Sequence, residues 1–125
     1  MANILSIGAG VMGTAITVPA SINGHSITLV GTHLDTEIIN SIQTTDIHPV
    51  LKVKLENTIS KQIDDLQQSD FDQADVIVIG VSSAGVDWFI ELLSKFQADN
   101  KKFLIITKGY ILMTKKLLIF FPTRF

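Results

Sequence analysis

The chain has 125 residues, of which 46% are hydrophobic and 18% charged, with a formal net charge of -2 and no cysteine. This composition predicts one folded domain with its own core rather than a disordered chain. The weak negative charge provides no basic field for nucleic acid, and the lack of cysteine excludes thiolate metal sites and disulfides. No apolar run reaches the roughly 20 residues of a membrane span, and no signal peptide is visible. We therefore expect a cytoplasmic protein without nucleic-acid or membrane partners.

The first 30 residues alternate strand and helix patterns. Residues 3–7 and 26–30 are short apolar or β-branched runs, which predict two buried strands. Residues 11–23 predict a helix between them, with Gly24 as its C-terminal cap. Pro19 interrupts this helix pattern and predicts a kink or a lost backbone hydrogen bond.

The next segment has weaker signals. Residues 35–42 predict a helix with Asp35 or Thr36 as N-cap, because its isoleucines share one face. The stretch "VKLENTIS", residues 53–60, is consistent with a short third strand. The stretch "IDDLQQ", residues 63–68, is consistent with a single helical turn.

The signal sharpens again from residue 74. Residues 74–81 form a nearly continuous apolar run, as expected of a central parallel strand buried on both faces. Residues 84–96 predict an amphipathic helix, and residues 102–107 a fifth strand. This alternation predicts an α/β fold, a Rossmann-type doubly wound parallel sheet of five strands in the order 3-2-1-4-5. The residues expected to face the core from the last helix are Val86, Phe89, Ile90, Leu93 and Phe96.

The stretch "GAGVMG" has the spacing G-x-G-x-x-G between a predicted strand and a predicted helix. Gly8 permits a tight turn, Gly10 lets a pyrophosphate approach the backbone, and Gly13 lets the helix pack closely on the sheet. The helix start adds N–H groups and partial positive charge. A glycine turn without a ligand is the alternative. The predicted cofactor-binding residues here are Gly8, Ala9, Gly10, Val11, Met12 and Gly13.

The end of the second strand bears on the choice of cofactor. The acid that binds the ribose 2′-OH of NAD in this fold is expected there, but the position holds Gly31. Thr32 could donate a hydrogen bond to a 2′-phosphate, and His33 could add charge. We therefore expect NADP or NAD as cofactor, with Thr32 and His33 near the adenosine ribose. A plain turn is the alternative, and Asp35 is interpreted as a helix cap rather than a ribose ligand.

Other polar residues do not predict a catalytic site. His25, His33 and His48 are too dispersed to indicate a metal site. The pair Ser82-Ser83 lacks the G-x-S-x-G context of a hydrolase nucleophile. Asp70, Asp72 and Asp75 are interpreted as loop and strand-entry residues, and Trp88 as a packing residue.

Several stretches together resemble one family. "NGHSITLVG", "HPVLKVKL", "VIVIGVSSAGV" and "IITKG" resemble segments of the N-terminal domain of NAD(P)-dependent glycerol-3-phosphate dehydrogenase. The resemblance covers residues 3 to about 110. This chain departs from the family pattern at Ser82, where a proline is frequent, and at Val30, where a tryptophan is usual.

The resemblance implies further site residues. Val81, Ser82, Ser83 and Ala84 would line the cofactor cleft, and Lys108 would lie beside the nicotinamide and the substrate phosphate. The implied reaction is hydride transfer between glycerol 3-phosphate and NAD(P), giving dihydroxyacetone phosphate. The resemblance also implies a small-molecule substrate, a role in glycerophospholipid metabolism and, as one option, a homodimer of the full enzyme. The family's catalytic lysine lies in a helical C-terminal domain, so we expect no catalytic residue in this chain.

We divide the chain into a cofactor-binding domain, residues 1–110, and an atypical tail, residues 111–125. The tail leads us to interpret the chain as a truncated or frame-shifted product or a fragment, one that binds NAD(P) weakly and is inactive alone. Two alternatives remain open. One is a related two-domain reductase of the ketopantoate or 6-phosphogluconate type, and the other is a non-catalytic NAD(P)-sensing module.

Overall fold

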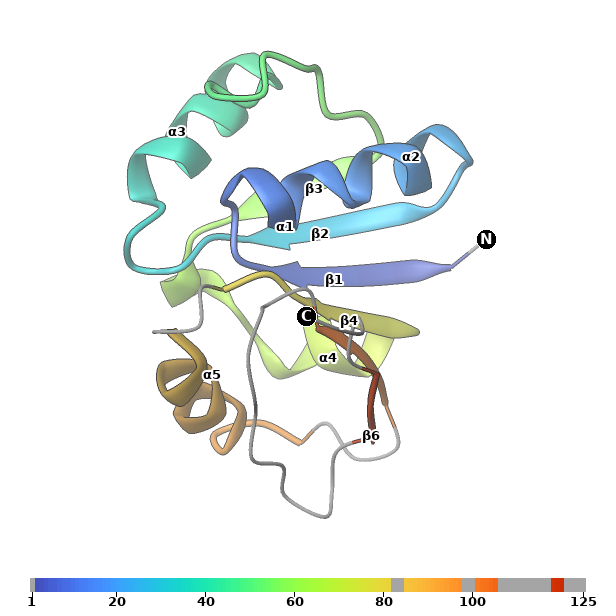
Figure 1. Ribbon diagram of the computed structural model, residues 1–125, viewed down its shortest axis with the longest axis vertical. Coiled ribbons are helices and arrows are strands. Elements are labelled where there is room, and N and C mark those ends of the chain that lie inside the picture. The colour runs from blue at the N-terminus through green and yellow to red at the C-terminus, as the bar shows by residue number, and fades with distance from the viewer. Residues whose placement is uncertain (1, 82–84, 98–100, 106–117, 121–125) are drawn as a thin grey trace.

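A computed structural model of the chain describes residues 2–81, 85–97, 101–105 and 118–120 (Figure 1). The strands are β1 (Asn3–Ile7), β2 (Ser26–Val30), β3 (Thr58–Lys61), β4 (Val76–Ile79), β5 (Lys102–Ile105) and β6 (Leu118–Phe120). All strand pairs are parallel, and the five predicted strands lie in the predicted order, β3-β2-β1-β4-β5. The short strand β6 extends the sheet beyond β5. The predicted Rossmann-type α/β fold is therefore confirmed.

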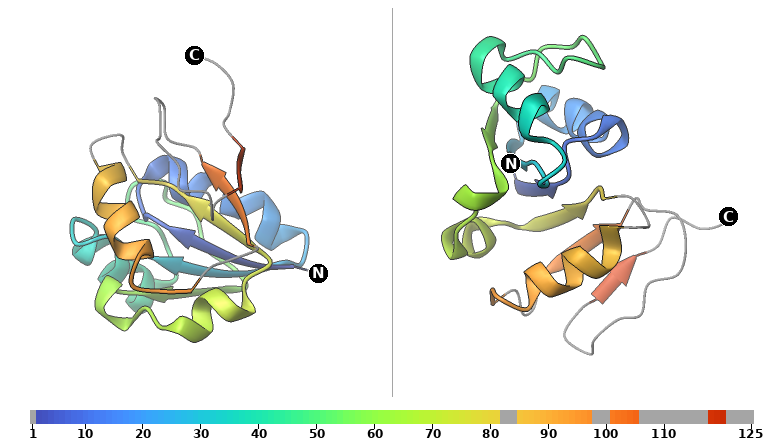
Figure 2. Two further views of the ribbon diagram at one scale, coloured as in Figure 1. Left: turned by 90° about the horizontal axis from the view of Figure 1, so that it is seen from below. Right: turned by 90° about the vertical axis from the view of Figure 1, so that its left-hand side faces the viewer.

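Helices cover both faces of this sheet (Figures 1 and 2). They are α1 (Val11–Ala15), α2 (Thr17–Ile22), α3 (Thr36–Thr45), α4 (Gln68–Gln73) and α5 (Val86–Leu93), with a short 3-10 helix, Ile63–Asp65, before α4. Helices α1, α2 and α3 lie over one face of the sheet, whereas α4 and α5 lie over the other. Within the described ranges, no helix has the length and apolar character needed to cross a membrane.

The sheet separates two hydrophobic clusters, because neighbouring residues of a strand point to opposite faces. The larger cluster lies under α4 and α5 and includes Leu5 and Ile7 of β1 together with Phe103 of β5. The smaller cluster lies under α3 and includes Leu29 of β2 with Ile39 of α3. Each of these five side chains is 1% exposed or less. Of the residues predicted to face the core from α5, Phe89 and Leu93 are buried in the larger cluster, and Phe96 packs against it.

The interruption that Pro19 predicts in the helix over residues 11–23 is observed, because the chain forms α1 and α2 with a break at Ile16. The cause is Pro19, which lies four residues after Ala15, the last residue of α1. Proline has no N–H to donate to the carbonyl four residues earlier, and its ring clashes with that carbonyl. The helix therefore stops at Ala15 and restarts one residue later.

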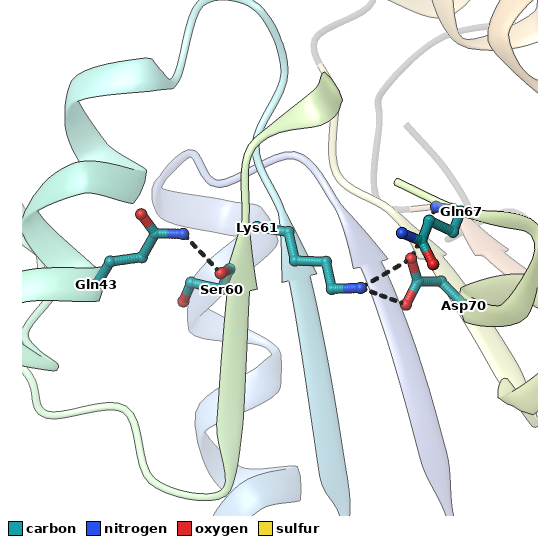
Figure 3. Close-up of polar contacts among 5 residues, drawn as sticks. All are labelled: Gln43, Ser60, Lys61, Gln67 and Asp70. Atoms are coloured by element: carbon teal, nitrogen blue, oxygen red, sulfur yellow. Dashed lines mark hydrogen bonds and ion pairs between the residues drawn. The ribbon is translucent and has the colours of Figure 1, made fainter. Parts of the chain in front are cut away.

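The edge strand β3 is held by side chains from two helices (Figure 3). Gln43 of α3 donates from Nε2 to the backbone carbonyl of Ser60 at 2.9 Å. Lys61 lies 2.9 and 3.2 Å from the two carboxylate oxygens of Asp70 in α4. The same carboxylate accepts the N–H of Gln67 at 2.9 Å and closes a capping box at the start of α4. The interpretation of Asp70 as a loop residue is wrong, since it caps and anchors a helix that sequence patterning missed.

The end of α2 generates a stability prediction. Gly24 has φ +89°, its N–H donates to the carbonyl of Ser21, and the N–H of His25 donates to the carbonyl of Ala20. This is the Schellman arrangement, which favours glycine because an L side chain is strained at positive φ. We expect Gly24→Ala to lower the free energy of unfolding by about 1–2 kcal/mol. Urea denaturation measures this loss, and Gly24→Asn should recover part of it because asparagine tolerates this backbone region.

Candidate functional site

The candidate site lies at the carboxyl ends of the parallel strands, where the glycine turn Gly8–Gly13 leaves β1 and enters α1. The turn is joined to both neighbouring strands. The N–H of Gly8 donates to the carbonyl of Val30 at the end of β2, at 2.8 Å. The N–H of Gly80, directly after β4, donates to the carbonyl of Ile7 at 2.8 Å. Strand order reverses between β1 and β4, and open parallel sheets bind ligands outside such a point.

Two glycines of the turn are required by close backbone packing. Gly8 has φ +111°, and a Cβ on it would lie 2.7 Å from the backbone carbon and oxygen of Gly80. A Cβ on Gly13 would lie 2.6 Å from the carbonyl oxygen of Gly8 and 3.4 Å from the Cα of Gly80. Real Cβ atoms essentially never approach backbone atoms below 3.0 Å. Gly80 was not predicted as part of this site, although a glycine directly after a buried strand was the available signal.

Gly10 differs from both, because a Cβ on it would meet no atom of the described chain within 4 Å. Among the described residues, the side-chain position of Gly10 therefore faces open space, and packing against them does not account for a glycine here. Ala9, by contrast, is fully buried, and its side chain packs in the smaller cluster with Leu29. Val11 and Met12 form the first turn of α1, and their side chains lie outside the described part of the structure.

The position expected for the ribose-binding acid is closed by packing. A Cβ on Gly31 would lie 2.5 Å from Cγ1 of Ile39 and 3.0 Å from Cβ of Asp35. Ile39 is fully buried in α3, so it has no free space into which to move. An aspartate or glutamate at position 31 would therefore require α3 to shift. The missing acid has a steric explanation in the close approach of α3 to the end of β2.

Asp35 instead directs its carboxylate to the glycine turn. Its Oδ2 accepts hydrogen bonds from the N–H of Ala9 at 3.0 Å, the N–H of Thr32 at 3.0 Å and the hydroxyl of Thr32 at 3.1 Å. Asp35 occupies the N-cap position of α3, as predicted, but its side chain makes no capping hydrogen bond to that helix. The residue joins the turn after β2 to the turn after β1.

Thr32 and His33 lie at the end of β2, as predicted, in different environments. Thr32 is 9% exposed, and its hydroxyl donates to Asp35 and accepts the N–H of Leu34 at 3.2 Å. His33 is exposed, and its ring centroid lies 5.5 Å from that of Trp88 in α5, with an interplanar angle of 57°. Trp88 also packs against the larger cluster, as predicted. Only His33 of these two predicted residues presents its side chain to solvent.

The remaining predicted site residues follow β4 and β5. The side chain of Val81 is 6% exposed and belongs to the larger cluster, so it can meet a cleft only through its backbone. The predictions for Ser82, Ser83, Ala84 and Lys108 lie outside the described residues. Their roles stay predictions that derive from the family resemblance.

His48 also contacts the glycine turn, and the sequence did not indicate this contact. Its ring is fully buried, and Nε2 lies 2.9 Å from the carbonyl oxygen of Ala9. Its Nδ1 accepts the N–H groups of Val50 and Leu51, each at 3.2 Å. The contact with Ala9 joins residues 39 positions apart, so no local pattern could reveal it. In the described segments, no group of three or more histidine, cysteine, aspartate or glutamate side chains could hold a metal ion.

Comparison with known proteins places this geometry in context. The family described as NAD-dependent glycerol-3-phosphate dehydrogenase N-terminus matches residues 3–120. The chain is 35% identical over 105 residues to the NADP(+)-dependent glycerol-3-phosphate dehydrogenase of Archaeoglobus fulgidus, a match that covers 84% of this chain and 31% of that protein. The family match extends past residue 110, where the resemblance read from the sequence ended.

Solved structures share the fold at lower identity. Glycerol-3-phosphate dehydrogenase from Coxiella burnetii matches with a TM-score of 0.72 and 18% identity, over 86% of this chain and 33% of that one. A candidate 2-dehydropantoate 2-reductase from Enterococcus faecalis matches with a TM-score of 0.68 and 16% identity, over 95% and 40% of the two chains. D-mandelate dehydrogenase matches with a TM-score of 0.69 and 14% identity, over 94% and 39%. The chain thus spans about a third of the length of its first relatives.

The glycine geometry predicts unequal costs for adding a single methyl group. We expect Gly13→Ala to lower the free energy of unfolding by about 1–3 kcal/mol, because its Cβ would collide with the carbonyl of Gly8. Gly10→Ala should cost less than about 1 kcal/mol, because its Cβ would meet no described atom within 4 Å. Urea denaturation of both variants measures the difference, and equal losses would contradict this assignment.

Proposed function

The chain belongs to the family described as NAD-dependent glycerol-3-phosphate dehydrogenase N-terminus, and on that premise we propose that its glycine turn, Gly8–Gly13, binds the pyrophosphate of NAD or NADP. The observation that carries this proposal is the contrast among the three glycines of the motif. Gly8 and Gly13 are required by packing, whereas Gly10 faces open space. A missing side chain beside open space at the carboxyl edge suits the close approach of a ligand.

The surrounding residues fit such a cofactor. Because Gly8 and Gly13 have no side chains, β1, α1 and Gly80 pack closely together, and this packing supports the backbone of Gly10. His33, exposed at the end of β2, is proposed to face the adenosine ribose. The hydroxyl of Thr32 already donates to Asp35, so contact between Thr32 and a 2′-phosphate requires that hydrogen bond to be exchanged. Ser82, Ser83, Ala84 and Lys108 complete the proposed cofactor site, with Lys108 also at the substrate phosphate.

We propose that this chain is the cofactor-binding portion of an enzyme that interconverts glycerol 3-phosphate and dihydroxyacetone phosphate, within cytoplasmic glycerophospholipid metabolism. When bound, the nicotinamide accepts or supplies the hydride of this reaction. The residues of this chain bind and orient the cofactor, and we assign none of them as the proton acceptor. The candidate 2-dehydropantoate 2-reductase and the D-mandelate dehydrogenase share the fold at 16% and 14% identity, which gives no separate support to a different substrate.

The proposal predicts graded loss of cofactor binding from substitutions at Gly10. Alanine and then valine would fill the open space beside the backbone of Gly10, so affinity for NADH and NADPH should fall in that order. We expect Gly10→Val to weaken binding about tenfold or more, equivalent to about 1.4 kcal/mol. Titration followed by nicotinamide fluorescence measures both affinities, and urea denaturation confirms that each variant is folded.

Two outcomes would contradict this proposal. One is a folded wild-type chain that binds neither NADH nor NADPH at millimolar concentration. The other is a folded Gly10→Val variant with unchanged affinity. A screen of the same chain with dihydroxyacetone phosphate and with 2-keto acids is the matched control, and we expect no turnover with either class.

A further inference from the structure

The peptide groups of Ala9 are engaged by side chains from two distant segments. Its N–H donates to Oδ2 of Asp35 at 3.0 Å, and its carbonyl lies 2.9 Å from Nε2 of His48. Asp35 immediately precedes α3, and His48 follows it. Ala9 lies between Gly8 and Gly10. The side chains of Asp35 and His48 therefore both contact the first half of the glycine turn.

The protonation pattern of His48 follows from its contacts. Nδ1 faces the N–H groups of Val50 and Leu51, so it must present a lone pair and act as an acceptor. In a neutral imidazole, the other nitrogen then carries the proton. Nε2 therefore donates to the carbonyl of Ala9, and the ring links a rigid turn after α3 to the glycine turn.

The segment that carries His48 is itself closed by hydrogen bonds. The N–H of His48 donates to the carbonyl of Val53 at 3.1 Å, and the N–H of Lys52 donates to the carbonyl of His48 at 2.8 Å. The segment is closed further by an antiparallel bridge between Ile47 and Lys54. The ring is fully buried, so the donor at Nε2 has a fixed position.

We propose that His48, together with Asp35, is a positioning residue for cofactor binding, an inference that rests on the function proposed above. Asp35 fixes the Gly8–Ala9 peptide group through its N–H, and His48 fixes the Ala9–Gly10 peptide group through its carbonyl. Together they set the direction of the backbone that leads into Gly10. A binding loop ordered before its ligand arrives binds more tightly, because less conformational entropy is lost on association. His48 acts through the carbonyl of Ala9 and does not touch the cofactor.

The test uses two substitutions that separate the nitrogens of His48. His48→Gln keeps an N–H donor within reach of the Ala9 carbonyl, near the position of Nε2. His48→Asn keeps an acceptor near the position of Nδ1 for Val50 and Leu51 and is too short to reach Ala9. Both variants lose the packing of the ring, so a merely structural role predicts similar effects on binding. The matched control is His25→Asn. His25 lies at the amino ends of β1 and β2, away from the glycine turn, and its Nδ1 accepts the N–H of Ala2 there.

We expect His48→Asn to weaken NADH and NADPH binding by about tenfold, whereas His48→Gln and His25→Asn stay within about threefold of wild type. Combining His48→Asn with Asp35→Ala should cost less than the sum of the two single effects, because the two side chains hold successive peptide groups on either side of the Ala9 Cα. Affinities are measured by titration calorimetry at temperatures where each variant is folded. Equal losses in His48→Gln and His48→Asn, or no loss in either, would overturn the proposal.

A second readout keeps this test independent of the proposed function. If the wild-type chain binds neither NADH nor NADPH, the proposed function fails, and amide hydrogen exchange of Ala9 and Gly10 in the ligand-free variants decides whether His48 orders the glycine turn. Faster exchange in His48→Asn than in His48→Gln supports it. The same exchange rates in both variants would overturn it.

Discussion

The hydrogen bonds to the two peptide groups that flank the Cα of Ala9 are the constraint on which the arrangement of the site depends. Asp35 accepts the N–H of Ala9, and His48 contacts its carbonyl, so the turns that follow β1, β2 and α3 are joined at one buried residue. An unpaired buried peptide group would cost about 1–3 kcal/mol, so these contacts contribute to the stability of the fold as well as to the geometry of the turn. The close approach of α3 to the end of β2 also explains why Gly31 cannot carry an acid, because Ile39 and Asp35 fill the space that a Cβ would need.

Much of the fold could be predicted from local patterns. Residues 3–7 and 26–30 match β1 and β2 because uninterrupted apolar and β-branched runs have few alternatives in a parallel sheet. The G-x-G-x-x-G spacing identified the turn because close backbone packing requires glycine at two of its positions, Gly8 and Gly13. The break between α1 and α2 could have been placed from Pro19 alone, since proline acts on the carbonyl four residues before it.

Other features depend on contacts that sequence spacing does not encode. Helix α4 escaped prediction because its residues, Gln68–Gln73, are mostly polar, and Phe71 is the one large apolar side chain among them. The role of His48 depends on a partner 39 residues away, and a lone histidine has many possible environments. Asp35 was correctly placed at the start of α3, but its carboxylate bonds the glycine turn because the folded chain brings Ala9 within 3.0 Å. Long-range packing decided each of these outcomes.

The glycine turn is ordered before any cofactor binds, and amide hydrogen exchange of Ala9 in the ligand-free chain measures this order. Ala9 lies outside the strands and helices, yet its N–H has a carboxylate partner and its side chain is fully buried. We expect this N–H to exchange as slowly as that of Leu5 in the centre of β1. Exchange of the Ala9 N–H at the rate of an unstructured peptide, while Leu5 stays protected, would contradict it.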